Sequence, residues 1–169
     1  MTTMTATSVP IESALHSTLP SADFFDAYEA PLQDPTLMPT EIFLRASRAT
    51  PKWVGRLMAI RNAIVRRLGL KDVGSMGGGS RRPAADYRVG DRVGIFDVFA
   101  ISERELVLGI DDSHLDVRVS IFKSAAQKSA RYTVSTVVHI KNKLGHIYML
   151  PVGRIHPLVV RAMMRRASV

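Results

Sequence analysis

The feature that most restricts the fold is a series of short apolar runs joined by links of turn length. The runs cover residues 92–102, 105–110, 115–122 and 132–140. Apolar and polar side chains alternate along the last two, as is typical of half-buried β-strands. Links this short join antiparallel neighbours, because a parallel pair needs a long crossover connection. We therefore expect a curved antiparallel meander with helices packed on one face.

Helical patterns flank the meander. Thr40 is expected to cap a helix that begins at Glu41, and Pro51 to split this helix in two, because an interior proline removes a hydrogen bond. A last helix is expected to begin near Pro157. The second helix carries an apolar stripe that we expect to lie in the core, formed by Trp53, Leu57, Ile60, Ile64 and Leu68.

Two further strands complete the expected sheet. One covers residues 22–28, and the other covers residues 146–152 after a hairpin turn at residues 142–145. The sequence thus predicts an α+β fold with about six antiparallel strands. A kinked N-terminal helix pair and a long C-terminal helix would pack on this curved sheet.

The chain of 169 residues fits a single domain. We expect residues 1–20 to form a disordered tail and residues 21–169 the domain. A glycine-rich stretch at residues 72–86 is expected to be a flexible loop. It is not a typical phosphate-binding loop, since no strand precedes it and its spacing does not match the glycine motifs.

The chain contains no cysteine, which excludes disulfides, thiolate nucleophiles and thiolate metal sites. The N-terminus has no basic segment followed by an apolar run, so we predict no signal peptide. No stretch of about 18 apolar residues is present, so no membrane span is expected. These features favour a cytoplasmic protein of bacterial type with no membrane partner.

The net charge of +8 is unevenly distributed. Residues 1–41 contain no Lys or Arg, whereas residues 42–71 and 117–169 contain no Asp or Glu. Such segments either attract anionic partners or simply solvate helix and strand faces. The absence of interleaved aromatic residues and of a known motif argues against nucleic acid.

The sharpest candidate site is a polar row on one strand, where side chains two residues apart share a face. The row comprises Asp112, His114, Asp116, Arg118 and Ser120. Facing a cavity, it would be an acid–base set with His114 as the base, Asp116 orienting it and Arg118 binding an anion. Facing outward, it would be a charged network on a wet sheet face. A metal site is not expected, because strand spacing spreads the donors too far apart.

Other side chains are candidates for contact with a ligand. His139 lies on a predicted strand, and methionine fills irregular apolar space. The ligand-binding candidates are Asp112, His139, Trp53, Met149 and Met163. No serine nucleophile motif is present.

Several fragments in a fixed order resemble a known family. They are residues 51–54, 57–62, 68–70, 89–91, 108–120, 144–148 and 156–160. Over residues 22–167 the chain resembles the bacterial domain of unknown function 2867, and the element order resembles the helix-grip fold of START-like and birch-allergen-like domains. The resemblance implies this fold but transfers no catalytic residue. Similar domains also occur fused to short-chain-dehydrogenase-like domains, which implies a dehydrogenase-like protein as a partner.

The expected function is the binding of a small hydrophobic or amphipathic molecule between the sheet and the last helix. The alternative is a cyclase or dehydratase that uses His114, Asp116 and Arg118. A third reading is a binder of nucleic acid or another polyanion. Whether the chain is an enzyme stays open, and no cofactor is expected.

Overall fold

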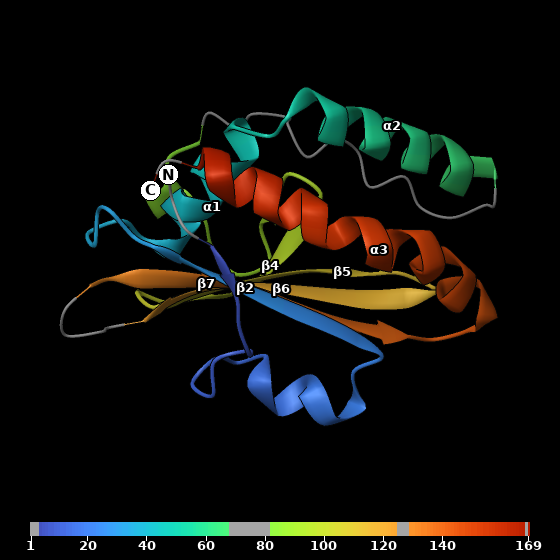
Figure 1. Cartoon of the computed structure of the whole chain (residues 1–169), viewed down its shortest axis with the longest axis horizontal. Coiled ribbons are helices and arrows are strands. Elements are labelled where there is room, and N and C mark those ends of the chain that lie inside the picture. The colour runs from blue at the N-terminus through green and yellow to red at the C-terminus, as the bar shows by residue number, and fades with distance from the viewer. Residues whose placement is uncertain (1–3, 68–81, 125–128, 168) are drawn as a thin grey trace.

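The computed structural model describes residues 4–67, 82–124, 129–167 and 169. Its centre is a curved antiparallel sheet of seven strands in the order β1-β2-β7-β6-β5-β4-β3. Figure 1 shows α1, α2 and α3 on one face of this sheet and the N-terminal segment on the other. The α+β class expected from the sequence is confirmed, with seven strands instead of about six.

The elements have the following bounds. The strands are β1 (Thr5–Ala6), β2 (Phe24–Pro31), β3 (Arg92–Val93), β4 (Phe96–Ile101), β5 (Glu105–Asp111), β6 (Leu115–Ser124) and β7 (Arg131–Ile140). The helices are α1 (Pro39–Arg48), α2 (Lys52–Arg67) and α3 (Lys143–Arg166), with short 3-10 turns η1 (His16–Ser21) and η2 (Ala84–Asp86).

The predicted meander forms β4 to β7, each strand antiparallel to the next. The expected strand at residues 92–102 is divided into β3 and β4 by a tight turn, where Gly94 has φ of 60°. Only glycine adopts this left-handed conformation without strain. The first expected strand is β2, which pairs with β7 and so places the N-terminal and C-terminal halves side by side in the sheet.

The alternation along the strands divides the apolar core between the two faces of the sheet. On the helix-covered face, Leu106 and Leu108 are completely buried and belong to the large core with Ile42 of α1. On the opposite face, Val107 and Val137 pack with Val9 and Leu15 of the N-terminal segment, among others.

The expectation of a disordered tail at residues 1–20 is wrong for residues 4–20. Thr5 and Ala6 pair with β2 as strand β1, and Val9 and Leu15 are buried against the sheet. The hydroxyl of Ser13 donates a hydrogen bond to Glu105 at 2.5 Å. Two isolated apolar residues leave no periodic signal, which is why the sequence did not reveal this cover.

The hairpin turn at residues 142–145 and the strand at residues 146–152 are also wrong. Helix α3 begins at Lys143 and runs to Arg166 with Pro151 and Pro157 inside it. The side chain of Asn142 caps it by accepting a hydrogen bond from the backbone N–H of Gly145 at 3.2 Å. Each interior proline costs about 3 kcal/mol, so packing on the sheet must offset this.

Helix α1 begins earlier than expected. Pro39 is its first residue, where the missing N–H costs nothing, and Met38 occupies the cap position. Thr40 therefore lies in the first turn and is not the cap. Glu41 accepts a hydrogen bond from the backbone N–H of Met38 at 2.8 Å. As expected, Pro51 separates α1 from α2.

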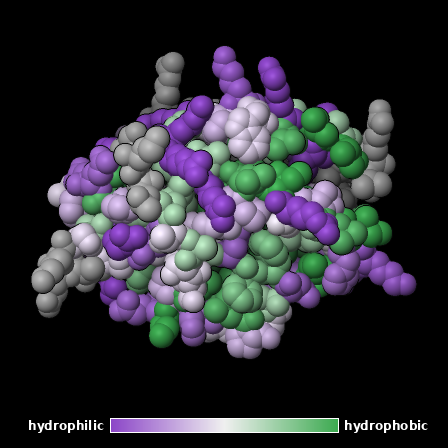
Figure 2. Space-filling model, viewed as in Figure 1, coloured by the Kyte–Doolittle hydropathy of each residue, from purple (hydrophilic) through white to green (hydrophobic). Residues whose placement is uncertain are grey.

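The apolar stripe of α2 does not lie in the core. Trp53, Ile60 and Ile64 are 42%, 58% and 54% exposed. Among the α2 side chains that the structure describes, only Val54 and Asn62 are buried. Figure 2 shows hydrophobic residues gathered at the surface over α2 and α3. Leu68 and most of the glycine-rich stretch lie outside the described residues.

Helix α3 offers a test of how closely its first turn packs on the sheet. At position 145 a Cβ atom would overlap the carbonyl oxygen of His114, whereas at position 153 it would meet Phe24 at an ordinary 3.7 Å. We expect Gly145→Ala to lower the free energy of unfolding by about 2 kcal/mol, as overpacking does. Gly153→Ala should raise it by about 0.5 kcal/mol through helix propensity. Urea denaturation of both variants provides the measurement, and equal effects would contradict the close packing.

Candidate functional site

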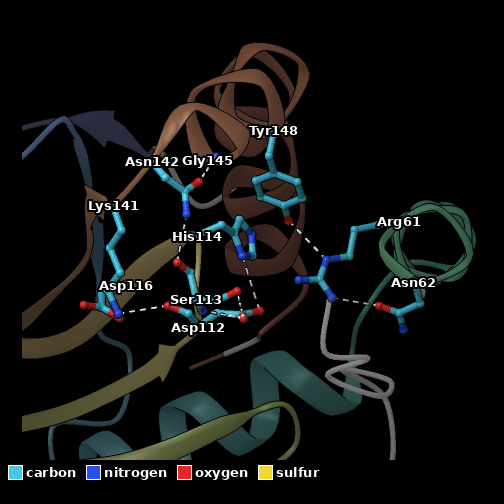
Figure 3. A network of polar contacts seen from close by, with 10 residues as sticks. All are labelled: Arg61, Asn62, Asp112, Ser113, His114, Asp116, Lys141, Asn142, Gly145 and Tyr148. Atoms are coloured by element: carbon cyan, nitrogen blue, oxygen red, sulfur yellow. Dashed lines mark hydrogen bonds and ion pairs between the residues drawn. The ribbon is translucent and has the colours of Figure 1, made fainter. Parts of the chain in front are cut away.

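The candidate site lies where the turn between β5 and β6 meets the beginning of α3 (Figure 3). The backbone N–H of Lys141 donates to the carbonyl oxygen of His114 at 3.0 Å, and its side chain donates to that of Asp112 at 2.8 Å. The side-chain amide of Asn142 donates to the carbonyl oxygen of Ser113 at 3.0 Å. These contacts fix the turn beneath the first turn of α3.

His114 is the most deeply buried ionisable group of this site, with 1% of its side chain exposed. Its Nδ1 lies 3.5 Å from Oδ2 of Asp112, and its ring meets the ring of Tyr148 edge-on at 5.2 Å. Burial lowers the pKa of His114, and the nearby carboxylate of Asp112 opposes this shift. The imidazole is therefore held neutral beside a buried carboxyl group.

Some buried polar atoms of His114 and Asp112 lack hydrogen-bond partners of ordinary length. Nδ1 of His114 and Oδ2 of Asp112 meet only each other, at 3.5 Å, and among the described residues Nε2 of His114 has no hydrogen-bond partner. The other oxygen of Asp112 accepts from the backbone N–H of Ser113 at 2.6 Å. Buried polar atoms without partners are rare in native proteins and call for a ligand, a water molecule or a functional role.

Helix α2 contributes a positively charged side chain, Arg61, to the site. The Nε of Arg61 on α2 donates to the hydroxyl of Tyr148 at 3.1 Å, and its Nη1 donates to Oδ1 of Asn62 at 3.0 Å. Among the described residues, no carboxylate forms an ion pair with this guanidinium. The positive charge of Arg61 helps to lower the pKa of His114.

The structure separates the polar row that the sequence grouped on one face. Asp116 pairs with Lys141 at 2.7 Å, and Arg118 pairs with Asp111 at 2.6 Å. The guanidinium of Arg118 also stacks 3.8 Å from the ring centroid of Phe99. The carboxyl group beside His114 is therefore that of Asp112 and not that of Asp116, and Arg118 bonds elsewhere.

The separation arises because residues 112–114 belong to a turn, where the strict alternation of a strand does not apply. Asp116 lies opposite His139 on the sheet, and His139 contacts Thr18 and Ser21 of the N-terminal segment. Asp116 thus faces the N-terminal segment, whereas His114 faces α3. Ser120 also bonds away from the site, to Glu105 at 2.5 Å.

The remaining ligand-binding candidates do not gather in one place. His139 is half-buried on the face that the N-terminal segment covers. Trp53 is exposed on α2, and Met149 and Met163 are half-buried on α3. Of the predicted set, Asp112 lies beside His114.

Sequence reasoning missed Tyr148 and Arg61, because both join the site only if residue 148 is helical. Asn142 followed three residues later by Gly145 was the available signal, since asparagine is a preferred cap. This cap signal was overlooked because residues 142–145 were predicted to form a hairpin turn.

A second buried acid–base pair was also missed. Nδ1 of His156 on α3 lies 3.4 Å from Oδ2 of Asp26 on β2, and the ring of Phe24 packs at a tilt against the imidazole, with the ring centroids 5.9 Å apart. Burial raises the pKa of Asp26 and lowers that of His156, so both favour their neutral forms. The pair of His156 and Asp26 joins the middle of α3 to the sheet. The pair of His114 and Asp112 lies beneath the beginning of the same helix.

The arrangement at His114 is suited to proton transfer and to the binding of an anion. A neutral imidazole next to a carboxyl group is an acid–base dyad, and Arg61 and Tyr148 can donate to an acceptor. Among the described residues, no group of three or more His, Asp or Glu side chains is placed to hold a metal ion.

Comparison with known proteins gives one assignment. Residues 18–163 match the model of the DUF2867 family, which is described as 'protein of unknown function'. No curated protein matches the chain.

The burial of His114 predicts a dependence of stability on pH. The pKa of His114 is lowered from 6.5 in the folded state, so the unfolded chain binds more protons below that pH. The free energy of unfolding therefore falls as the pH falls below 6.5. His114→Gln should make the free energy of unfolding depend less steeply on pH. Adding His156→Gln should weaken this dependence again, because the pKa of His156 is also lowered. Denaturation curves between about pH 8 and pH 5 test this; parallel profiles for wild type and His114→Gln would contradict it.

Proposed function

The chain belongs to the DUF2867 family, whose function is unknown, and we propose that it binds a small anionic amphipathic molecule between its sheet and its helices. The observation that carries the proposal is the buried polar cluster at the start of α3. There Nδ1 of His114 meets Oδ2 of Asp112 only at 3.5 Å, and Nε2 of His114 has no hydrogen-bond partner among the described residues. Such atoms are costly unless an occupant satisfies them.

The cluster fits the head group of a carboxylate ligand. The guanidinium of Arg61 and the hydroxyl of Tyr148 are donors next to each other, joined at 3.1 Å. An arginine fork matches the two oxygens of a carboxylate and binds it more strongly than a neutral acceptor. His114, as a neutral imidazole, can donate a third hydrogen bond.

Partly buried apolar side chains are available on the helix-covered side of the sheet. Met58 of α2, Ile110 of β5, Val119 of β6 and Val160 of α3 are partly buried and pack against the core. Binding sites for small molecules combine apolar walls with a few placed polar groups. These side chains would contact the apolar part of the ligand.

Helix α2 is the element that would move to admit the ligand. It buries few of its described side chains, so little apolar surface holds it to the rest of the molecule. Its Arg61 contacts Tyr148 of α3, the bond that the ligand would replace. The proposal therefore assigns α2 the role of a cover.

The arrangement also supports a helix-grip fold like that of START-like domains. A long C-terminal helix lies across an antiparallel sheet, and β2 brings the N-terminal half next to β7. We propose this likeness from the order of the elements, and it carries no activity with it.

A second candidate function is acid–base catalysis on the bound molecule. The 3.5 Å approach of Nδ1 of His114 to Asp112 favours it, with Asp112 in the role first expected of Asp116. His114 would take a proton from the ligand, and Arg61 and Tyr148 would stabilise the resulting negative charge. A His114→Gln variant that still binds the ligand but forms no product would support catalysis.

The ligand proposal is tested by comparing straight-chain fatty acids of different lengths with the matching alcohols, all below their aggregation concentrations. The acids should raise the melting temperature more than the alcohols. Arg61→Gln should remove this difference and weaken acid binding about tenfold or more, since a hydrogen bond to a charged group contributes about 1.5–3 kcal/mol.

The matched control is Arg56→Gln on the same helix, where the side chain is exposed and does not contact Tyr148 or His114. This variant should retain the preference for the acid. If acids and alcohols stabilise the protein equally, or if both variants respond alike, the head group is not bound at Arg61.

A further inference from the structure

The surface of α2 and α3 carries large apolar side chains that the fold leaves uncovered (Figure 2). On α2 these are Trp53, Ile60 and Ile64, which are 42%, 58% and 54% exposed. On α3 they are Ile147, Leu150, Ile155 and Leu158, of which Ile147 is 64% exposed and Leu158 58%. We term these apolar side chains, together with a set of exposed basic residues on the same two helices, the basic apolar face. The basic residues of the set are Lys52, Arg56, Lys143, Arg154, Arg161 and Arg165.

The side chains of this face follow the same spacing on both helices. Arg56, Ile60 and Ile64 lie three, seven and eleven residues after Trp53. Leu150, Arg154 and Leu158 lie three, seven and eleven residues after Ile147. This spacing places each set along one side of its helix. Each helix thus presents three apolar residues and one arginine in a line.

The charges of the two helices are of one sign. Neither α2 nor α3 contains an Asp or Glu, whereas Lys52, Arg56, Lys143, Arg154, Arg161 and Arg165 are exposed on them. A second copy of this chain is a poor occupant, because two such faces would bring like charges together. The occupant must offer both negative charge and apolar contact.

From this combination we propose that the basic apolar face docks on an anionic lipid surface. Amphipathic helices with Trp, Leu and Ile on one side and Lys and Arg beside them lie in the membrane interface. The apolar side chains would enter the boundary of the acyl chains, and the basic residues would contact anionic head groups.

The contact is peripheral and does not depend on the ligand proposed at Arg61. None of the described helices is long and apolar enough to cross a membrane. Helices α2 and α3 lie next to each other on the same side of the sheet, joined by Arg61 and Tyr148. They therefore present their apolar residues from one layer of the molecule. This contact departs from the sequence-based expectation of no membrane partner, which considered only spanning segments and placed the α2 stripe in the core.

Trp53 provides a direct readout, because it is the single tryptophan of the chain and lies on this face. The full chain is mixed with vesicles of phosphatidylcholine alone or with phosphatidylglycerol added. Anionic vesicles should shift the Trp53 emission to shorter wavelength, and brominated acyl chains should quench it. Neutral vesicles should do neither. Lack of a shift with anionic vesicles would overturn the proposal.

Substitutions separate docking from simple adsorption of a basic protein. Leu150→Ser combined with Leu158→Ser should reduce binding to anionic vesicles at least about tenfold, since each removes a large apolar side chain. Ile11→Ser is the control, because Ile11 is 83% exposed on the N-terminal segment and outside the face. Arg56→Gln should weaken binding about fivefold, and Arg104→Gln, which removes the same charge elsewhere, should not.

Two results would contradict the docking. One is that the serine pair and the Ile11 control bind equally, which means that charge alone holds the protein. The other is that a soluble acidic polymer shifts the Trp53 emission as vesicles do, which means that the face fits an acidic macromolecule.

Discussion

The rest of the structure depends on one contact, in which the junction between β7 and α3 packs against the turn between β5 and β6. The backbone N–H of Lys141 bonds the carbonyl oxygen of His114 at 3.0 Å, and Asn142 both caps α3 and donates to Ser113. Gly145 lets the first turn of the helix approach the carbonyl of His114 more closely than any other residue would. This junction sets the direction of α3 across the sheet, buries His114 and brings Tyr148 over its ring.

That burial has a chemical consequence. A histidine and a carboxyl group held away from water are expensive unless they have partners, and here they lie 3.5 Å apart with unpaired atoms. The adjoining cation comes from α2, where only Val54 and Asn62 are buried among the described side chains. The ligand site and the basic apolar face both involve α2, which keeps Trp53, Ile60 and Ile64 outside the core.

The sequence predicted the strands of the meander well, because apolar and polar residues alternate along β6 and β7 and the links between the strands are short. It failed where one contact far along the chain decides the structure. Residues 146–152 form a short apolar run like that of a strand, yet the cap at Asn142 and packing on the sheet make them helical. The sequence placed Asp112 and His114 in one polar row, but it assigned Asp116 to orient His114 and Arg118 to bind an anion by extending strand alternation into a turn, whereas Asp112 lies beside His114. Arg61 had no local signal, because its place depends on how α2 lies over α3.

The central claim is that α2 is a loosely held cover over a buried site fixed by α3. Amide hydrogen exchange of the unliganded protein tests this most directly. The account predicts that the amides of α2 exchange at least about tenfold faster than those of β6 and β7, through local opening that leaves the sheet intact. If α2 is protected as strongly as the central strands, the helix opens only when the whole molecule unfolds, and the account is wrong.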